Sequence, residues 1–352
     1  MRNYPKGISQ SFSCPAGERI DQIKGGQEGM KKIFFLLALG FVMSGNPALA
    51  KDYPDKVITI VVPFAAGGPT DTVARILAVP MGKNLNQQLI VENVGGAGGT
   101  LGANRVAKSP PDGYTIFLHH IGQSTAPALY RKLPYDPIKD FEPIGLINEV
   151  PMTLVAKKDF PPKDLKEMIA YVKANKAKVN LANAGLGAAS HLCGTLFQSS
   201  IETDLTTIPY SGTGPAMNDL LGGQVDIMCD QTTNTTSQIK AGKIKVYGVT
   251  TKKRVPSLPN IPTMDEAGLK GFEVTIWHAL YAPKGTPKPI IDKLTKALQF
   301  ALKDNMVKQR FADLGTAPVS DDRANPEALR KHLKAEIDKW GPILKKAGAY
   351  AD

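Results

Sequence analysis

The stretch that decides the fold reads VITIVVPFAAGGPTD and spans residues 57–71. Its first part, Val57–Phe64, is a largely β-branched apolar run, which predicts a buried strand. Gly67 and Gly68 predict a tight turn in which the backbone can approach a ligand closely, and Pro69 suits the first turn of a helix. Apolar residues then recur at helical spacing, at Val73, Ile76, Leu77 and Met81. The stretch therefore predicts a strand, a glycine-rich turn and a helix.

The same alternation continues along the chain. Further strands are predicted at Leu89–Val91, Tyr114–Leu118, Val179–Leu181, Thr206–Ile208, Val225–Cys229 and Lys245–Val249. Helical segments such as Leu165–Ala174 and Pro215–Leu221 lie between them, and the C-terminal part is helical. Apolar strands that alternate with amphipathic helices predict an α/β fold with a parallel sheet covered on both faces.

Residues 30–50 have the three parts of a cleaved secretory signal peptide. Met30 is followed by two lysines, an apolar run from Ile33 to Met43 and the small-residue box Ala48-Leu49-Ala50. The apolar run is shorter than the about 20 residues that a membrane-spanning helix needs. We expect residues 1–29 to be an upstream extension from a misplaced start codon, and the mature protein to begin at Lys51. This predicts export to the periplasm of a Gram-negative bacterium.

Chain length favours two lobes. Beyond residue 50 the chain has 302 residues, which is at the upper end of a single domain. Open α/β sheets bind ligands at the carboxyl ends of their strands, beside helix N-termini. Two lobes joined without a long linker would place two such edges on either side of a central cleft.

The basic charge of the mature chain does not indicate nucleic-acid binding. Beyond residue 50, 37 Lys and Arg stand against 29 Asp and Glu, a net charge of +8. The lysines are scattered along helical stretches, with no arginine-rich block and no interleaved aromatic residues. We therefore expect a solvated basic surface that attracts anions, and no nucleic-acid partner.

Two cysteines, Cys193 and Cys229, follow the signal peptide. An even number of cysteines in an exported protein permits a disulfide. Two buried free thiols are the alternative, because a sequence does not give the Cα separation that a bridge requires.

The first candidate binding site is the turn from Phe64 to Asp71. Gly67, Gly68 and the start of the following helix offer free N–H groups and the positive end of a helix dipole, which favour an anion. Thr70 and Asp71 add polar side chains at the same edge. The alternative is an ordinary turn in which Asp71 caps the helix.

The second candidate is a similar turn at residues 185–191, with Gly187, Ser190 and His191. It could form the matching anion site in the other lobe. A hydrolase would need a nucleophile elbow of the Gly-x-Ser-x-Gly type, which this segment lacks. We therefore interpret His191 as a pocket or helix-start residue and expect no catalytic residues.

The third candidate is the polar run from Asp230 and Gln231 to Thr236, after a predicted strand. It offers hydrogen-bonding groups at a strand end, and a capped helix start is the alternative. The pair His119-His120 could suggest a metal site, but no further metal ligands stand near it at a recognisable spacing. The glycines at 96–102 do not match the glycine pattern of dinucleotide-binding proteins. We expect no metal and no cofactor.

Together these segments resemble the extracytoplasmic solute receptors of the tripartite tricarboxylate transporter group, the Bug family. The similarity extends over the whole mature chain. The matching blocks are Tyr53-Pro54, Val62–Asp71, Val91–Gly102, Pro111–Tyr114, Leu133–Pro137, Ser190–Leu192, Asp219–Asp226, Lys240–Lys243 and Pro259–Gly268. Ala65-Ala66 departs from the family, because many relatives have proline there.

The resemblance implies a two-lobed periplasmic-binding-protein fold of type II, the Venus flytrap. Domain 1 would comprise residues 51–150 and 275–352, and domain 2 residues 151–274. Two loops would bind a ligand carboxylate from opposite sides of the cleft. The implied contacts are Phe64, Gly67, Gly68, Thr70, Asp71, Gly187, Ser190 and His191, with Gln123, Asp230 and Gln231 added from their positions at strand ends.

The resemblance also implies the function. We expect a monomeric receptor, not an enzyme, that delivers a dicarboxylate, tricarboxylate or acidic amino acid to a membrane permease. The run at 230–236 and the pair Cys193 and Cys229 resemble the subgroup that binds acidic amino acids. The alternatives are a ligand sensor for a signalling system and an exported α/β hydrolase.

Overall fold

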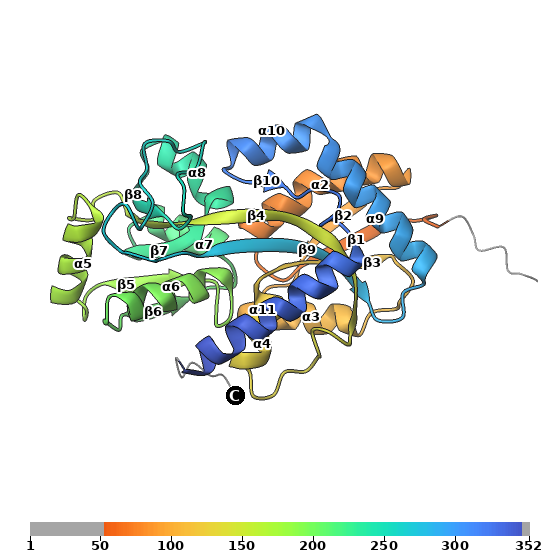
Figure 1. Cartoon of the computed structure of the whole chain (residues 1–352), viewed down its shortest axis with the longest axis horizontal. Coiled ribbons are helices and arrows are strands. Elements are labelled where there is room, and N and C mark those ends of the chain that lie inside the picture. The colour runs from red at the N-terminus through yellow and green to blue at the C-terminus, as the bar shows by residue number, and fades with distance from the viewer. Residues whose placement is uncertain (1–52, 347–352) are drawn as a thin grey trace, which may run out of the picture. The chain divides into compact units, whose positions relative to one another are not determined.

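The structure, a computed structural model, describes residues 53–346 (Figure 1). The predicted signal peptide and the segment before it lie outside the described residues. The strands are β1 (Ile58–Val62), β2 (Leu89–Asn93), β3 (Thr115–His120), β4 (Phe141–Lys157), β5 (Asn180–Asn183), β6 (Thr206–Pro209), β7 (Ile227–Gln231), β8 (Ile244–Val249), β9 (Thr275–Pro283) and β10 (Ala317–Pro318).

Helices lie between most of the strands. They are α2 (Pro69–Leu85), α3 (Thr100–Ala107), α4 (Gly122–Leu129), α5 (Leu165–Ala174), α6 (Ala189–Ser200), α7 (Thr213–Leu221), α8 (Thr232–Lys240), α9 (Lys288–Lys303), α10 (Asn305–Asp313) and α11 (Pro326–Lys346), with a 3-10 turn at Ala97–Gly99. The mixed α/β architecture agrees with the sequence prediction.

The strands follow the order β2-β1-β3-β9-β4-β7-β5-β6, and β8 and β10 both pair with β4. The long strand β4 belongs to both lobes, because its residues 141–151 pair with β9 and its residues 152–157 pair with β7 and β8. We call the part built on β1, β2, β3 and β9 lobe 1, and the part built on β5–β8 lobe 2. In Figure 1, β4 and β9 run side by side from one lobe to the other. The predicted domain boundaries, after residues 150 and 274, fall close to this change of partners and stay predictions.

The expectation of a parallel sheet is correct only in part. Strands β1, β2 and β3 pair in parallel, as do β5, β6 and β7, but β4 pairs antiparallel with β7, β8, β9 and β10. Sequence reasoning missed β4 because Pro143, Gly145 and Pro151 interrupt its apolar pattern. The strand accommodates such residues through register shifts between Pro143 and Gly145 and between Leu146 and Asn148.

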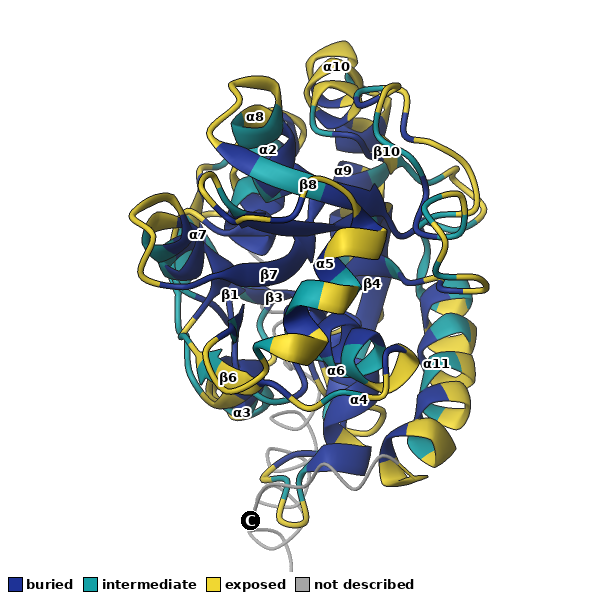
Figure 2. Ribbon diagram, turned by 90° about the vertical axis from the view of Figure 1, so that its left-hand side faces the viewer, coloured by how far each residue is buried: buried dark blue, intermediate teal, exposed yellow. Residues whose placement is uncertain are grey.

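Helices cover both faces of β1. Ile58, Ile60 and Val62 pack into a core with residues of α2 and α9, whereas Val61 belongs to a second core with residues of α3. This division follows from the two-residue period of a strand. In Figure 2 the central strands such as β4 and β7 are buried, and the outer faces of the helices are exposed. Burial on both faces explains the continuous apolar run that identified this strand in the sequence.

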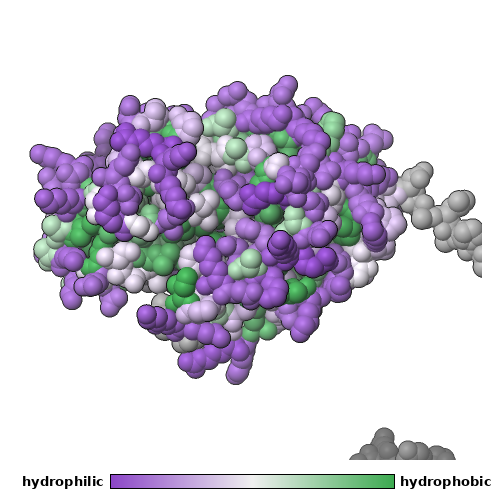
Figure 3. Space-filling view, viewed as in Figure 1, coloured by the Kyte–Doolittle hydropathy of each residue, from purple (hydrophilic) through white to green (hydrophobic). Residues whose placement is uncertain are grey.

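Hydrophilic side chains dominate the face shown in Figure 3, and hydrophobic residues lie mainly in recesses between them. Within residues 53–346, no helix combines the length and the apolar character needed to cross a bilayer.

Candidate functional site

A small pocket lies between the two lobes. Lobe 1 contributes Phe64, Gly68, Pro69, Thr70 and His120, and lobe 2 contributes Ala184, Ala189, Ser190, Thr213, Asp230 and Gln231. The cavity volume is about 10 Å³, which is room for about one water molecule. The lobes are therefore closed on each other in this structure.

The lobe 1 side is the predicted glycine turn after β1. Gly68 is the N-cap of α2, and Pro69 and Thr70 begin the helix. The Thr70 hydroxyl lies 3.3 Å from Nε2 of His278 on β9, and the Phe64 ring stacks on the His120 ring at a centroid distance of 4.7 Å. These contacts fix the turn against the buried strands of lobe 1.

The lobe 2 side combines the second and third candidate segments. The Ser190 hydroxyl accepts a hydrogen bond of 2.9 Å from the Ala184 N–H, which holds the start of α6 against the end of β5. Asp230 and Gln231 are the last two residues of β7, which ends two residues later than the sequence predicts. Both side chains are buried, and Oε1 of Gln231 has no hydrogen-bond partner.

Four helices begin at this pocket. Residues of the first turn or N-cap of α2, α6, α7 and α8 line it, namely Gly68 to Thr70, Ala189 and Ser190, Thr213, and Gln231. None of the four helices has a side-chain cap, a feature that they share with α3, α4 and α9, whereas Asp164 and Asp304 cap α5 and α10. The first N–H groups of a helix have no partner within the helix. The four helix starts therefore polarise the pocket positively without any charged side chain.

The pocket has two ionisable side chains. Burial lowers the pKa of His120 to about 3, so its ring is neutral near pH 7. Its Nδ1 accepts a hydrogen bond of 2.9 Å from the Gly122 N–H, which places the ring proton on Nε2. Burial raises the pKa of Asp230 to about 6, although hydrogen bonds from Asn234, Gln231 and Thr213 oppose the shift. The lining therefore holds a neutral donor and an acid, and no lysine or arginine.

Two predicted residues of the first turn, Gly67 and Asp71, lie outside the pocket lining. The Asp71 carboxylate accepts hydrogen bonds from the Gly67 N–H at 3.0 Å, from Nε of Arg75 at 2.9 Å and from Nδ2 of Asn93 at 3.0 Å. Burial alone would raise the pKa of Asp71, but these bonds hold it below its ordinary value. Asp71 thus fixes the shape of the turn, and Gly67 provides the positive φ of 80° that the turn requires.

Gln123, Gly187 and His191 also lie outside the lining. Gln123 on α4 is fully buried, and neither polar atom of its side chain has a partner. The Gly187 carbonyl accepts a hydrogen bond of 2.9 Å from the Thr125 hydroxyl of lobe 1. Nδ1 of His191 lies 3.4 Å from the Gly187 N–H, and burial lowers the pKa of His191 to about 4. Gly187 and His191 shape the second turn next to the pocket.

Sequence reasoning missed His120 and Thr213 as pocket residues. His120 ends β3, and Thr213 begins α7 after Gly212. His120 follows a predicted strand and Thr213 lies near the start of a predicted helix, and these positions could have identified them as pocket residues. The sequence pattern suggested His120 only as a metal ligand, and among the described residues no group of three or more His, Cys, Asp or Glu could hold a metal.

Backbone contacts between the lobes close the pocket. The Ala65 N–H of lobe 1 donates to the Ser211 carbonyl of lobe 2 at 3.0 Å. The Tyr130 hydroxyl lies 2.7 Å from the Ala97 carbonyl and 2.9 Å from the Leu186 carbonyl, so it bridges the lobes. Gly98 fits against Leu186 so closely that a Cβ on Gly98 would lie 1.7 Å from the Leu186 carbonyl oxygen. The closed form thus depends on close backbone packing.

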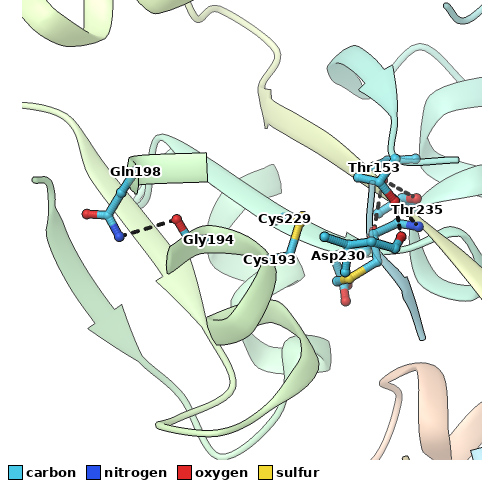
Figure 4. The surroundings of a disulfide bond; sticks show 10 residues. Thr153, Cys193, Gly194, Gln198, Cys229, Asp230 and Thr235 are labelled. Carbon is cyan, nitrogen blue, oxygen red and sulfur yellow. Dashed lines mark hydrogen bonds between the residues drawn. A yellow bond between two sulfur atoms is a disulfide. The ribbon is translucent and has the colours of Figure 1, made fainter. Parts of the chain in front are cut away.

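A disulfide joins Cys193 on α6 to Cys229 on β7, with a Cα separation of 5.9 Å (Figure 4). Cys229 directly precedes Asp230, whose carbonyl accepts a hydrogen bond of 3.1 Å from the Thr153 hydroxyl on β4. The bridge and the sheet therefore hold the strand end that carries Asp230.

Removal of this disulfide is expected to destabilise the protein. The bridge spans 36 residues, and a loop of that length corresponds to about 3–4 kcal/mol in the free energy of unfolding. Urea denaturation of Cys193→Ala/Cys229→Ala against the oxidised wild type measures the loss. Addition of reductant should lower the stability of the wild type and leave that of the double variant unchanged. Equal stability of the two oxidised proteins would contradict the prediction.

Comparisons with known proteins agree on one family. The family described as "Tripartite tricarboxylate transporter family receptor" matches residues 73–349. An Agrobacterium vitis protein, the UPF0065 protein in the TAR-I ttuE-ttuC' intergenic region, is 55% identical over 302 residues, which is 86% of this chain and 87% of that protein.

Two solved structures extend the similarity to the fold. The periplasmic binding protein BugD is 57% identical with a TM-score of 0.83, over 85% of this chain and all of that chain. MatC from Rhodopseudomonas palustris, solved with bound malate, is 44% identical with a TM-score of 0.81, over 83% of this chain and all of that chain. The architecture is thus the two-lobed fold of periplasmic binding proteins.

Proposed function

The chain belongs to the tripartite tricarboxylate transporter family of receptors, and from this we propose that it captures a small carboxylate in the periplasm and delivers it to a membrane permease. The observation that carries the proposal is the meeting of four uncapped helix starts at the pocket between the lobes. Such a site favours an anion through backbone N–H groups.

The strength of such contacts is sufficient for tight binding. Each charge-assisted hydrogen bond contributes about 1.5–3 kcal/mol, and micromolar affinity requires about 8 kcal/mol net. The hydroxyl of Ser190 and Nε2–H of His120 add neutral donors to those of the backbone. Several such bonds, less the cost of ordering, account for micromolar binding.

A small diacid is the ligand class that the related structures support. MatC carries malate, which has two carboxylates on a four-carbon chain. The cavity of about 10 Å³ is too small for such a ligand. Entry therefore requires the lobes to separate and then close around it, which is a hinge motion selected by the ligand. We propose that a monomer in the closed form is what the permease recognises.

The alternative of a hydrolase is not supported. The family is one of solute-binding receptors and not of enzymes. The Ser190 hydroxyl accepts a hydrogen bond from the Ala184 N–H, and Nδ1 of His191 lies near the Gly187 N–H, so the described hydrogen bonds of these two residues do not pair them as nucleophile and base. A ligand sensor would use the same pocket. A pull-down that recovers the permease would distinguish a role in transport from a role in sensing.

A thermal-shift screen tests the proposed function. The protein should gain about 2.7 kcal/mol of stability from a diacid present at 100 times its dissociation constant. L-malate, L-aspartate, succinate and citrate are the probes, and succinamide is the matched control because it has the same carbon chain without carboxylates. Stabilisation by succinamide, or by none of the four acids, would contradict the proposal.

A further inference from the structure

A chain of three polar side chains leads from the pocket into the interior of lobe 1. Thr70 lines the pocket, and its hydroxyl lies 3.3 Å from Nε2 of His278. Nδ1 of His278 lies 3.0 Å from Oδ1 of Asn148. Asn148 and His278 are fully buried, and Thr70 is 2% exposed. Of the three, Thr70 is the one that borders the pocket.

The inner end of the chain lies on the two strands that run from one lobe to the other. Asn148 on β4 and His278 on β9 stand opposite each other in the antiparallel pair, next to the register shift between Leu146 and Asn148. On its other side β9 pairs with β3, where His278 stands opposite His120 of the pocket lining. Strands on both sides therefore fix the backbone of His278, and its ring nitrogens lie towards Thr70 and Asn148.

The chain has a direction, because a neutral imidazole carries one proton. Burial lowers the pKa of His278 well below its ordinary value, so the ring is neutral at neutral pH. One ring nitrogen then donates and the other accepts. The carbonyl oxygen of Asn148 faces Nδ1, which places the proton there and leaves Nε2 to accept from the Thr70 hydroxyl. The single proton of that hydroxyl thus points away from the pocket.

The opposite direction leaves one polar atom unpaired, as the observed one does. Nδ2 of Asn148 is buried and, within residues 53–346, has no hydrogen-bond partner. Rotation of the amide would bring Nδ2 to Nδ1 of His278 and leave the carbonyl oxygen unpaired, which proteins tolerate better than an unpaired N–H. The ring proton would then lie on Nε2 and donate to Thr70, whose own proton becomes free for the pocket.

We propose that Asn148 and His278 are positioning residues that set the direction of the Thr70 hydroxyl, and that binding of an acid reverses the chain. Without a ligand, the Thr70 proton points inward to His278. A carboxylate at the helix starts only accepts hydrogen bonds, so it favours the direction in which Thr70 donates to it. The inference rests on the proposed function and adds a response of the lobe 1 interior to the ligand.

NMR of protein with isotope-labelled histidine tests the reversal, because the spectra distinguish a protonated ring nitrogen from an unprotonated one. We expect the proton of His278 on Nδ1 in the free protein and on Nε2 in the presence of saturating L-malate, L-aspartate, succinate or citrate. His120 is the internal control, since the Gly122 N–H at its Nδ1 keeps the ring proton on Nε2 in both states. The spectrum of His278→Gln assigns the signals.

Two results on the wild type would overturn the inference and leave the proposed function intact. One is the same tautomer of His278 in the free and the bound protein. The other is a second proton on the ring in the bound protein, because His278 would then donate at both nitrogens. Binding of none of the four acids would count against the proposed function itself.

A double-mutant cycle at about pH 8, where His278 stays neutral, tests the role of the chain. Asn148→Asp offers His278 an acceptor and no donor, which keeps the ring proton on Nδ1 and the Thr70 proton directed inward. Thr70→Val removes the hydroxyl and keeps the shape of the side chain. Each variant should bind the most stabilising of the four acids about 10-fold more weakly, the loss of one hydrogen bond to a charged group. The double variant should bind no more weakly than either single variant, because both act on one hydroxyl.

Losses that add to about 100-fold in the double variant would show that Asn148→Asp acts through its charge and not through Thr70, and would overturn the assignment. Normal affinity in Asn148→Asp would overturn it as well. Melting curves check that the variants fold, and the NMR spectrum of Asn148→Asp checks that His278 carries a single proton, on Nδ1. If a variant does not fold, the spectra of the wild type still decide whether the chain reverses.

Discussion

Replacement of Gly98 by alanine is expected to weaken ligand binding at least 100-fold while both lobes remain folded. A Cβ at this position would lie 1.7 Å from the Leu186 carbonyl oxygen and 2.8 Å from the Leu186 carbonyl carbon, both in the opposite lobe. Neither atom is the end of a flexible side chain, so the lobes must stay apart. A ligand that is held between them then loses its contacts on one side. A 100-fold loss corresponds to about 2.7 kcal/mol.

Calorimetric titration with the ligand found by the thermal-shift screen measures the loss. Gly242→Ala is the matched control, since Gly242 has the same φ of 62° but no atom within 4 Å of the position that a Cβ would take. Both variants carry the strain of a left-handed alanine, which is about 1 kcal/mol. Only Gly98→Ala carries the clash. Normal affinity in Gly98→Ala, or equal losses in the two variants, would show that closure does not depend on this contact.

Mild acid is expected to destabilise the protein through three buried histidines. His119, His120 and His278 are each at most 2% exposed, and burial lowers the pKa of all three. In the unfolded chain each takes up a proton below about pH 6.5 and in the folded chain it does not, so stability is present above pH 6.5 and is lost as pH falls. Well below pH 6.5 the loss approaches about 1.4 kcal/mol per pH unit for each histidine.

Asp230 opposes this loss. Because its pKa is raised to about 6, the folded state takes up a proton there before the unfolded state does, and this stabilises the protein as pH falls through 6. Between pH 6.5 and 5.5 these three histidines cost about 1 kcal/mol each, and His191, whose pKa is lowered to about 4, costs a similar amount. Over the same range Asp230 returns about 1 kcal/mol. Urea denaturation across this range measures the net change.

His119→Phe provides the control for this acid effect. His119 has an unpartnered Nδ1 and packs between the rings of Phe64 and Phe117, so phenylalanine keeps a ring there without a titrating group. The variant should show a slope of stability against pH that is smaller by about one proton. An unchanged slope would mean that His119 takes up a proton in the folded state as readily as in the unfolded state.

The sequence predicted most of the pocket residues because they lie at junctions between a strand and the following helix. Phe64, Gly68, Thr70, Ser190, Asp230 and Gln231 all stand where a strand ends and a helix begins, and the structure brings them together at one pocket. Asp71 follows the same rule, yet its side chain turns to Arg75 and Asn93. The direction of the Asp71 side chain depends on its hydrogen-bond partners, of which Asn93 lies 22 residues away, so the spacing of residues alone does not predict it.

Strand β4, which connects the two lobes, was the main feature that the spacing of apolar residues could not predict. β4 contains Pro143 and Pro151, which are typical of loops, and only pairing with β9, more than a hundred residues later, makes it a strand. His120 illustrates the same limit for the site. Its neutral, Nε2-protonated state depends on burial and on the Gly122 N–H, neither of which is visible in the pattern of residues.

The strand order has a consequence for how the chain is assembled. In the sheet, β9 lies between β3 and β4, although it is made after every strand of lobe 2. The amino-terminal half of lobe 1 therefore leaves the edges of β3 and β4 unpaired until residue 283 has emerged, while lobe 2 has most of its strands in one uninterrupted segment. A chain that is halted before β9 would present open strand edges, which are templates for aggregation and binding sites for chaperones.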